Sequence, residues 1–286
     1  MVAVDPFLYV SLGAGILAGQ LVPWRGRAIN ILTLAIIVVL IGLLGASLDS
    51  APTSSLLASI PYAALLVALL LGFTLLFVRL LPHRVGTGGA GTLKFPLQGL
   101  GFLAALIVGF GLGHGVDLPY PALITYSLYA LLFVVGFGLN LNFRALRTVA
   151  TPVAASFAGA LAASILFAVL TGISLRLALA SSFGFSWYTL VGPLVATRLG
   201  AAAGLLAFMA NFMRENLTMI VAPSVGPRAG PEALTAMGGA STMDTTLYFV
   251  TRYGDPESGS LALASGLILT ISASLLVPAV LALPLP

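Results

Sequence analysis

The sequence predicts an all-α, polytopic membrane protein, and its composition and hydropathy pattern lead to this fold class. Of the 286 residues, 59% are hydrophobic and only 7% are charged, whereas soluble domains carry about a quarter charged residues. The mean hydropathy is +1.12. The apolar residues form runs of about 20, the length that an α-helix needs to cross about 30 Å of hydrocarbon. A chain so poor in charge cannot cover a soluble surface, so we expect the lipid bilayer to be its partner.

Apolar runs and two more polar stretches divide the chain into about ten membrane segments. The apolar runs are residues 6–22, 29–48, 60–81, 95–113, 121–140, 152–172, 201–221 and 261–281. The two stretches that are hydrophobic but rich in Gly, Ser, Thr and Pro are residues 181–197 and 237–253. The prediction is ten segments if both polar stretches cross the membrane and eight if both re-enter. Either number is even and places both termini on one side.

The charges in the loops of the first half predict the orientation. The basic residues fall on one side of the predicted membrane: Arg25, Arg27, Arg79, Arg84, Lys94, Arg144 and Arg147. The opposite side carries only acids: Asp5, Asp49 and Asp117. Because basic loops stay in the cytoplasm, we expect a multi-pass plasma-membrane protein with its N-terminus and C-terminus outside.

Polar residues at bilayer depth indicate where function lies, because a charged residue there costs about 2.5–3.5 kcal/mol. Asp49 ends the second run, either as part of a site or as an interfacial residue. The segment 181–193 contains two glycines, a proline and several hydroxyl residues, which favours a broken, cavity-lining helix over a packing kink. Asn211 and Glu215 are four residues apart and share a helical face, whereas Arg214 points about 100° away.

A second broken helix is predicted at 238–246, with sequence GGASTMDTT. Its carboxylate, Asp244, contacts ligand or forms a salt bridge with Arg214 or Arg252; both alternatives stay open. For Glu215, likewise, the alternative to a functional role is an ion pair with a neighbouring helix. The substrate-binding candidates are Ser186, Tyr188, Asn211, Ser241, Thr242 and Asp244.

The positions of these features predict two inverted repeats of five segments each. A division after residue 140 gives a first repeat at 1–140 and a second at 141–286. The broken helices, near 181–197 and 237–253, are the second and fourth elements of the second repeat. In the first repeat the second and fourth runs end in GASLD and GFGLGHG, again the least regular. Matched interruptions are typical of inverted-repeat transporters with a site at the midplane.

Other classes of function are excluded or disfavoured. The chain has no Cys and two His, so no metal site, no cofactor and no intramembrane hydrolase is expected. The glycine-rich loop at 83–94 lacks the Gly-Lys-Ser/Thr ending of a phosphate-binding loop, and the basic residues suit topology better than nucleic acid. The motif VGFGL, at 108–112 and 135–139, predicts close helix packing.

Three motifs in order, SSFGFSWYTLVGPL, NFMRENLTMI and GGASTMDTTL, followed by a last apolar run, resemble the LysO-type lysine exporter family, mainly over 177–278. The resemblance implies the broken-helix fold of the cation/proton antiporter and anion transporter group. It also implies an essential membrane acid pair, carried over as Asp49 and Glu215. This chain departs from the family pattern at Phe212, where an acid is usual, and at Tyr248, where a proline is usual.

The resemblance and the lack of a nucleotide-binding motif together predict a secondary active exporter of L-lysine or a close basic amino acid, not an enzyme. The exchanged ion is expected to be H+, with Na+ as the alternative. Carboxylates at Asp49 and Glu215 attract the ammonium groups of lysine when ionised and lose that attraction when protonated. Rival functions with the same fold are a sodium/proton antiporter and an organic-ion transporter.

Overall fold

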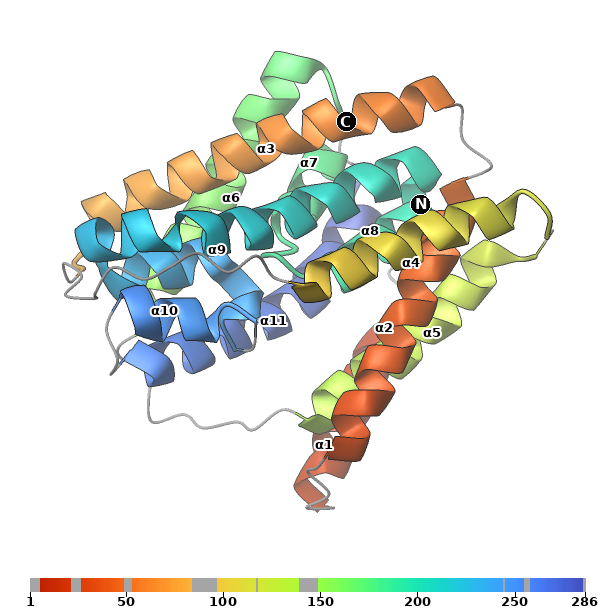
Figure 1. Cartoon of the computed structure of the whole chain (residues 1–286), viewed down its shortest axis with the longest axis horizontal. Helices are drawn as coiled ribbons and strands as arrows, with labels where there is room; N and C mark the ends of the chain where they lie inside the picture. The colour runs from red at the N-terminus through yellow and green to blue at the C-terminus, as the bar shows by residue number, and fades with distance from the viewer. Residues whose placement is uncertain are drawn as a thin grey trace.

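The computed structural model of the chain describes residues 6–21, 27–48, 53–83, 97–116, 118–138, 149–243, 245–254 and 258–284. Within these ranges the regular secondary structure is entirely helical (Figure 1). The prediction of an all-α protein is therefore confirmed. Asp49 and Asp244, two of the predicted site residues, lie outside the described residues.

The helices follow the predicted order along the chain. The first half contains α1 Pro6–Leu21, α2 Arg27–Ser47, α3 Thr53–Leu80, α4 Leu97–Gly113 and α5 Tyr120–Gly138. The second half contains α6 Ala150–Thr171, α7 Leu175–Ser182, α8 Tyr188–Leu199, α9 Ala201–Gly238, the 3-10 helix η3 Gly239–Met243, α10 Leu247–Tyr253 and α11 Gly259–Ala282.

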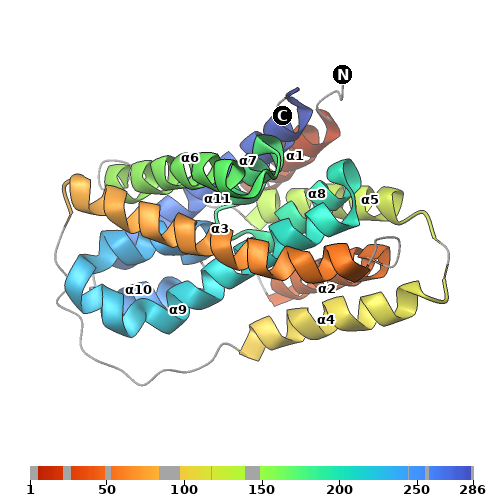
Figure 2. The same cartoon turned by 90° about the horizontal axis from the view of Figure 1, so that it is seen from above.

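The helices form two groups that meet along α8 and α9. In the first group α1 packs along α5 and α2 along α4, while α3 leaves this group and packs against α6 and α9 (Figures 1 and 2). Helices α6 to α11 and α3 form the second group. Because α8 contacts both α2 and α5, it lies at the boundary between the groups.

Glycines bring the helix pairs of the first group close together. A Cβ on Gly109 of α4 would meet the backbone of Gly42 in α2, and a Cβ on Gly136 of α5 would meet the backbone of Leu12 in α1. Only residues without a side chain allow such an approach between helices. Both glycines belong to the repeated VGFGL motif, so the predicted close packing is confirmed.

Three of the described helices are long and apolar enough to cross a membrane on length and composition alone. Their apolar parts are Leu57–Leu80, Ala150–Thr171 and Gly259–Ala282. Shorter apolar helices lie at Pro6–Leu21, Ile31–Ser47, Ala104–Gly113 and Tyr120–Val134. These helices are typical of a membrane protein, whereas the number of ten segments stays a prediction.

Helix α9 is longer than the apolar run from which it was predicted. It continues beyond residue 221, with Pro223 and Pro227 inside it, and turns only at Gly230, which has φ 82° and ψ 178°. Membrane helices accommodate proline because neighbouring groups satisfy the freed carbonyls. A left-handed φ, by contrast, ends the helical path, and glycine adopts it without steric cost. The segment 231–238 is thus a separate helical piece that leads into η3.

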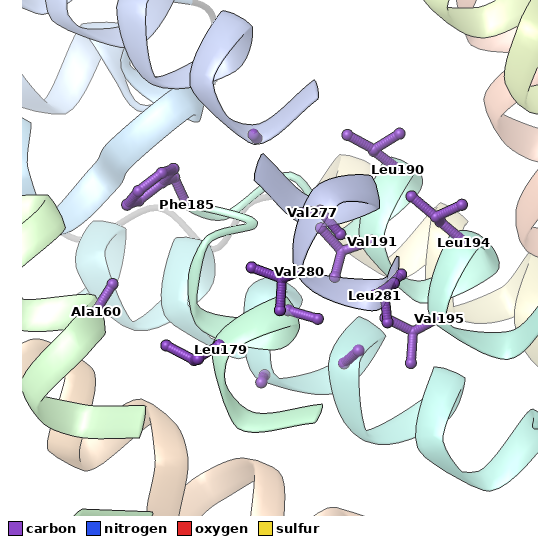
Figure 3. Packing of buried hydrophobic residues seen from close by; sticks show 14 of the residues in the cluster. Ala160, Leu179, Phe185, Leu190, Val191, Leu194, Val195, Val277, Val280 and Leu281 are labelled. Atoms are coloured by element: carbon purple, nitrogen blue, oxygen red, sulfur yellow. The ribbon is translucent and has the colours of Figure 1, made fainter. Parts of the chain in front are cut away.

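The largest buried cluster extends through both groups and includes the α7–α8 connection. Leu179 of α7, Phe185 of the connection and Val191 of α8 pack with Val277 and Val280 of α11 (Figure 3). This packing holds the chain around the connection in a fixed position. Helices α2 and α4 show no break within the described residues, so the matching of interrupted elements between the two halves stays a prediction.

Candidate functional site

Two helix breaks in the second half form the candidate site. The first, residues 183–187, separates α7 from α8, and within it Phe185 (φ 47°) and Ser186 (φ 74°) have left-handed backbone angles. Such angles are uncommon for residues other than glycine and persist only where surrounding contacts impose them. The second break begins at Gly239 (φ 67°), continues through η3 and ends at α10.

The two breaks are joined directly by a backbone hydrogen bond. The peptide N–H of Ala240 donates to the carbonyl oxygen of Phe185 at 2.7 Å. A Cβ on Gly239 would collide with the Phe185 carbonyl, so only glycine permits this approach. The polar backbone groups that each break frees thus lie next to each other in the protein interior.

Asn211 of α9 holds the first break in place. Its side-chain Nδ2 donates to the carbonyl of Ser181 at 2.7 Å and to that of Ala207 at 2.9 Å, and its Oδ1 accepts from the Ser186 N–H at 2.9 Å. Asn211 is 2% exposed. One amide side chain therefore fixes both ends of the connection between α7 and α8.

Arg214, three residues further along α9, holds the segment before the second break. Its Nε donates to the carbonyl of Met237 and its Nη2 to that of Ala236, both at 3.0 Å. These carbonyls end the helical piece 231–238, where a positive charge is favourable. The guanidinium carbon lies 5.9 Å from the centroid of the Phe185 ring, close enough for a cation–π contact.

Several buried polar atoms around the breaks have no hydrogen-bond partner among the described residues. They are Ser181 Oγ, Ser186 Oγ, Arg214 Nη1, Thr235 Oγ1 and Ser265 Oγ. Buried polar groups are normally hydrogen-bonded, so an unpaired group indicates a place for water, an ion or a ligand. All five atoms belong to the second half, in α7, the first break, α9 and α11.

The hydroxyl groups of the second break are hydrogen-bonded within the protein. Ser241 Oγ donates to the Gly238 carbonyl at 2.9 Å. Thr242 Oγ1 lies 2.8 Å from the Gly239 carbonyl and 2.9 Å from that of Ala262, and it donates to these oxygens. Each hydroxyl has one proton to donate, so both protons are used in this conformation.

The other predicted site residues lie in different surroundings. Glu215 is buried in α9 at 6% exposure, directly after Arg214. Tyr188 is also buried, but its ring packs against Phe208 and Phe212 of α9 and Phe102 of α4, with centroids 5.4–6.0 Å apart. Arg252 is exposed on α10. The structure thus brings Ser186, Asn211 and Arg214 together, and it places Tyr188 in an aromatic cluster next to α4.

Phe185 is not among the predicted site residues, although its carbonyl accepts from the second break and its ring lies against Arg214. No property of a phenylalanine in an apolar segment indicates such a role. Glu232 was also not predicted, although an acid after a Gly-Pro pair is a recognisable signal for the start of a helix. It is 7% exposed and starts the helical piece after Gly230, where the helix dipole stabilises a carboxylate.

Metal chemistry receives no support from the described part of the chain. Within it, no group of three His, Cys, Asp or Glu residues is placed to hold a metal ion. The arrangement at the breaks instead offers backbone dipoles, one buried guanidinium and unpaired hydroxyls. Such groups bind small charged molecules without covalent chemistry.

Comparison with known proteins identifies similar sequences. The sequence model of the family described as "Lysine exporter LysO" matches residues 103–281. The lysine exporter LysO of Escherichia coli (strain K12) is 28% identical over 293 residues, which cover 93% of this chain and 95% of that protein. A putative lysine exporter of Haemophilus influenzae (strain ATCC 51907 / DSM 11121 / KW20 / Rd) is 27% identical over 184 residues, 61% of this chain and 93% of that protein. No solved structure matches the chain significantly.

Proposed function

Because the chain belongs to the LysO lysine exporter family, we propose that it is a secondary active transporter that exports L-lysine, or a close basic amino acid, across the plasma membrane in exchange for protons. The observation that carries the proposal is the hydrogen bond between Ala240 and Phe185, which joins two broken helices in the buried interior. Broken helices that meet at one point form the substrate and ion sites of many secondary transporters.

In this proposal Glu215 and Asp49 couple the proton to the substrate. Ionised carboxylates attract the two ammonium groups of lysine, and protonation removes that attraction. Proton entry from outside therefore accompanies release of lysine to the outside. The burial of Glu215 supports the role, because a buried acid interacts strongly with any cation that reaches it.

The membrane arrangement that we propose has ten segments in two inverted repeats, with both termini outside. The helix order supports it: α1 to α5 give five segments before residue 140, and α6, α7–α8, the first part of α9, its second part with α10, and α11 give five after it. Under this arrangement the breaks at 183–187 and 239–246 belong to the second and fourth segments of the second repeat.

The test is radiolabelled lysine flux in proteoliposomes with an imposed pH gradient and no sodium. We expect lysine to accumulate against its gradient when protons move in the opposite direction. If lysine flux requires sodium, then Na+ and not H+ is the coupling ion. Proton flux driven by sodium without any lysine flux would show a sodium/proton antiporter and contradict the proposal.

A further inference from the structure

We infer that Arg214 binds the carboxylate of the transported amino acid through Nη1. The inference rests on the proposed function and makes it more specific. It means that the protein recognises an α-amino acid with both its ammonium and its carboxylate groups, rather than an organic cation of any kind.

The geometry of Arg214 supports this assignment. The side chain is completely buried, at 0% exposure. Nε and Nη2 each donate to a backbone carbonyl, which fixes the plane of the guanidinium. Nη1 has no hydrogen-bond partner among the described residues. A buried charge with a free donor in a fixed direction is costly unless an anion satisfies it, and guanidinium groups bind carboxylates especially well.

The other donors near the breaks are less suitable. The hydroxyl protons of Ser241 and Thr242 already bind carbonyl oxygens. The Ser186 hydroxyl, by contrast, has no partner in the described part of the chain, and it directly follows Phe185, the residue whose ring contacts the guanidinium. Among the unpaired donors of the described residues near the breaks, Arg214 Nη1 carries a charge, and Ser186 Oγ lies next to the residue whose ring contacts that charge.

The neighbouring acid explains why the ligand carries both charges. Glu215 follows Arg214 in α9, so the two side chains leave the same helical turn about 100° apart. A positive and a negative group on one turn complement a zwitterionic molecule. A diamine offers no carboxylate to Arg214.

The inference is tested by competition in the lysine flux assay with three unlabelled compounds: L-lysine, L-lysinamide and cadaverine. L-lysinamide replaces the carboxylate by an uncharged amide, and cadaverine lacks it. In the wild-type protein we expect both analogues to compete at least about tenfold more weakly than lysine, as for the loss of a hydrogen bond between charged groups. Equal competition by all three compounds would overturn the inference.

Two variants locate the effect. Arg214→Gln should reduce the preference for lysine over lysinamide to about twofold or less, because the charge that distinguishes them is gone. Arg228→Gln is the matched control: Arg228 is exposed on the same helix, and within the described residues it donates to the Ser224 carbonyl. The preference of this variant for lysine over lysinamide should equal that of the wild type. A full preference in Arg214→Gln would contradict the inference.

The outcomes separate this inference from the proposed function. Lysine flux with no preference over lysinamide would overturn the carboxylate contact and leave lysine export intact. Absence of lysine flux in the wild-type protein would overturn both. Competition by lysine relative to lysinamide in the wild-type protein tests the carboxylate contact even if Arg214→Gln folds poorly, because this measurement requires no variant.

Discussion

The N–H of Ala240 donates a 2.7 Å hydrogen bond to the carbonyl oxygen of Phe185, and through this bond the two helix breaks support each other. Neither residue is polar in its side chain, so the contact depends on backbone conformation alone. It places the connection between α7 and α8 against η3, at the start of the second break. A change of conformation at either break therefore acts directly on the other.

Gly239→Ala should weaken this contact. The new Cβ would collide with the Phe185 carbonyl and would also occupy a left-handed φ of 67°, so we expect a loss of about 2–4 kcal/mol from overpacking and backbone strain. The measurement is the apparent Tm in detergent together with lysine flux.

The control for this variant is Gly172→Ala. Gly172 also has a positive φ, 70° with ψ 4° against 67° with ψ −130° at Gly239, and nothing lies within 4 Å of its Cβ position. Its Tm should therefore fall only by the contribution of backbone strain. Equal losses in the two variants would show that the contact with Phe185 contributes nothing.

Asn211→Ala should destabilise the first break. The change removes the bonds to Ser181 and Ser186 and leaves buried backbone groups unsatisfied, which costs about 1–3 kcal/mol each. Asn216→Ala is the matched control on the same helix, because its bond within the described part of the chain goes to the Phe212 carbonyl one turn away. The thermal stability of both variants is measured side by side, and a similar change in the two would contradict the bridging role of Asn211.

A cysteine at position 186 should report the opening of the site. Ser186 is 2% exposed in this conformation, so a transport cycle that exposes the break must change its reactivity. We expect Ser186→Cys to react with a water-soluble maleimide in the absence of lysine, when the protein opens the break to water, and bound lysine to slow the reaction. Ser164→Cys, at an equally buried position where the hydroxyl binds Ser182, should stay unreactive, and an inert Ser186→Cys would contradict access to the break.

The orientation is tested with two further single cysteines, since the chain has none of its own. Val116→Cys, after α4, should react in intact cells with an impermeant thiol reagent. His83→Cys, after α3, should react only once the membrane is permeabilised, because the charge bias places this loop inside. The opposite labelling pattern would reverse the predicted topology.

Hydropathy predicts the helices well because the bilayer requires long apolar segments with satisfied backbones. It also predicts the neighbourhood of the first break, since Gly, Ser and Pro concentrate there. Hydropathy does not predict which residues of the break have left-handed backbone angles. Phe185 and Ser186 take left-handed angles although glycines lie nearby, because Ala240 and Asn211 bind their backbone groups. Such tertiary contacts have no signal in the local sequence.

The partners of Arg214 were equally beyond sequence reasoning. A buried arginine beside several membrane acids suggested an ion pair. In the structure its Nε and Nη2 bind the backbone carbonyls of Met237 and Ala236, and the predicted partner Asp244 lies outside the described residues. Carbonyls at a helix end attract a cation as an acid does. Because every residue has a carbonyl, the sequence does not indicate which two carbonyls bind the guanidinium.

Proton-coupled export requires Glu215 as a coupling acid, and the most direct measurement of this role is lysine flux against a gradient in proteoliposomes of Glu215→Gln. The amide keeps the size of the side chain and removes the titratable proton, so we expect a well-expressed protein without net lysine export. Asp49→Asn should behave in the same way, and Glu215→Asp should reduce flux without abolishing it. Glu232→Gln, which changes a buried acid at the start of a helical piece, is the control and should retain export. A well-expressed Glu215→Gln protein that still exports lysine against its gradient would contradict the coupling role of Glu215.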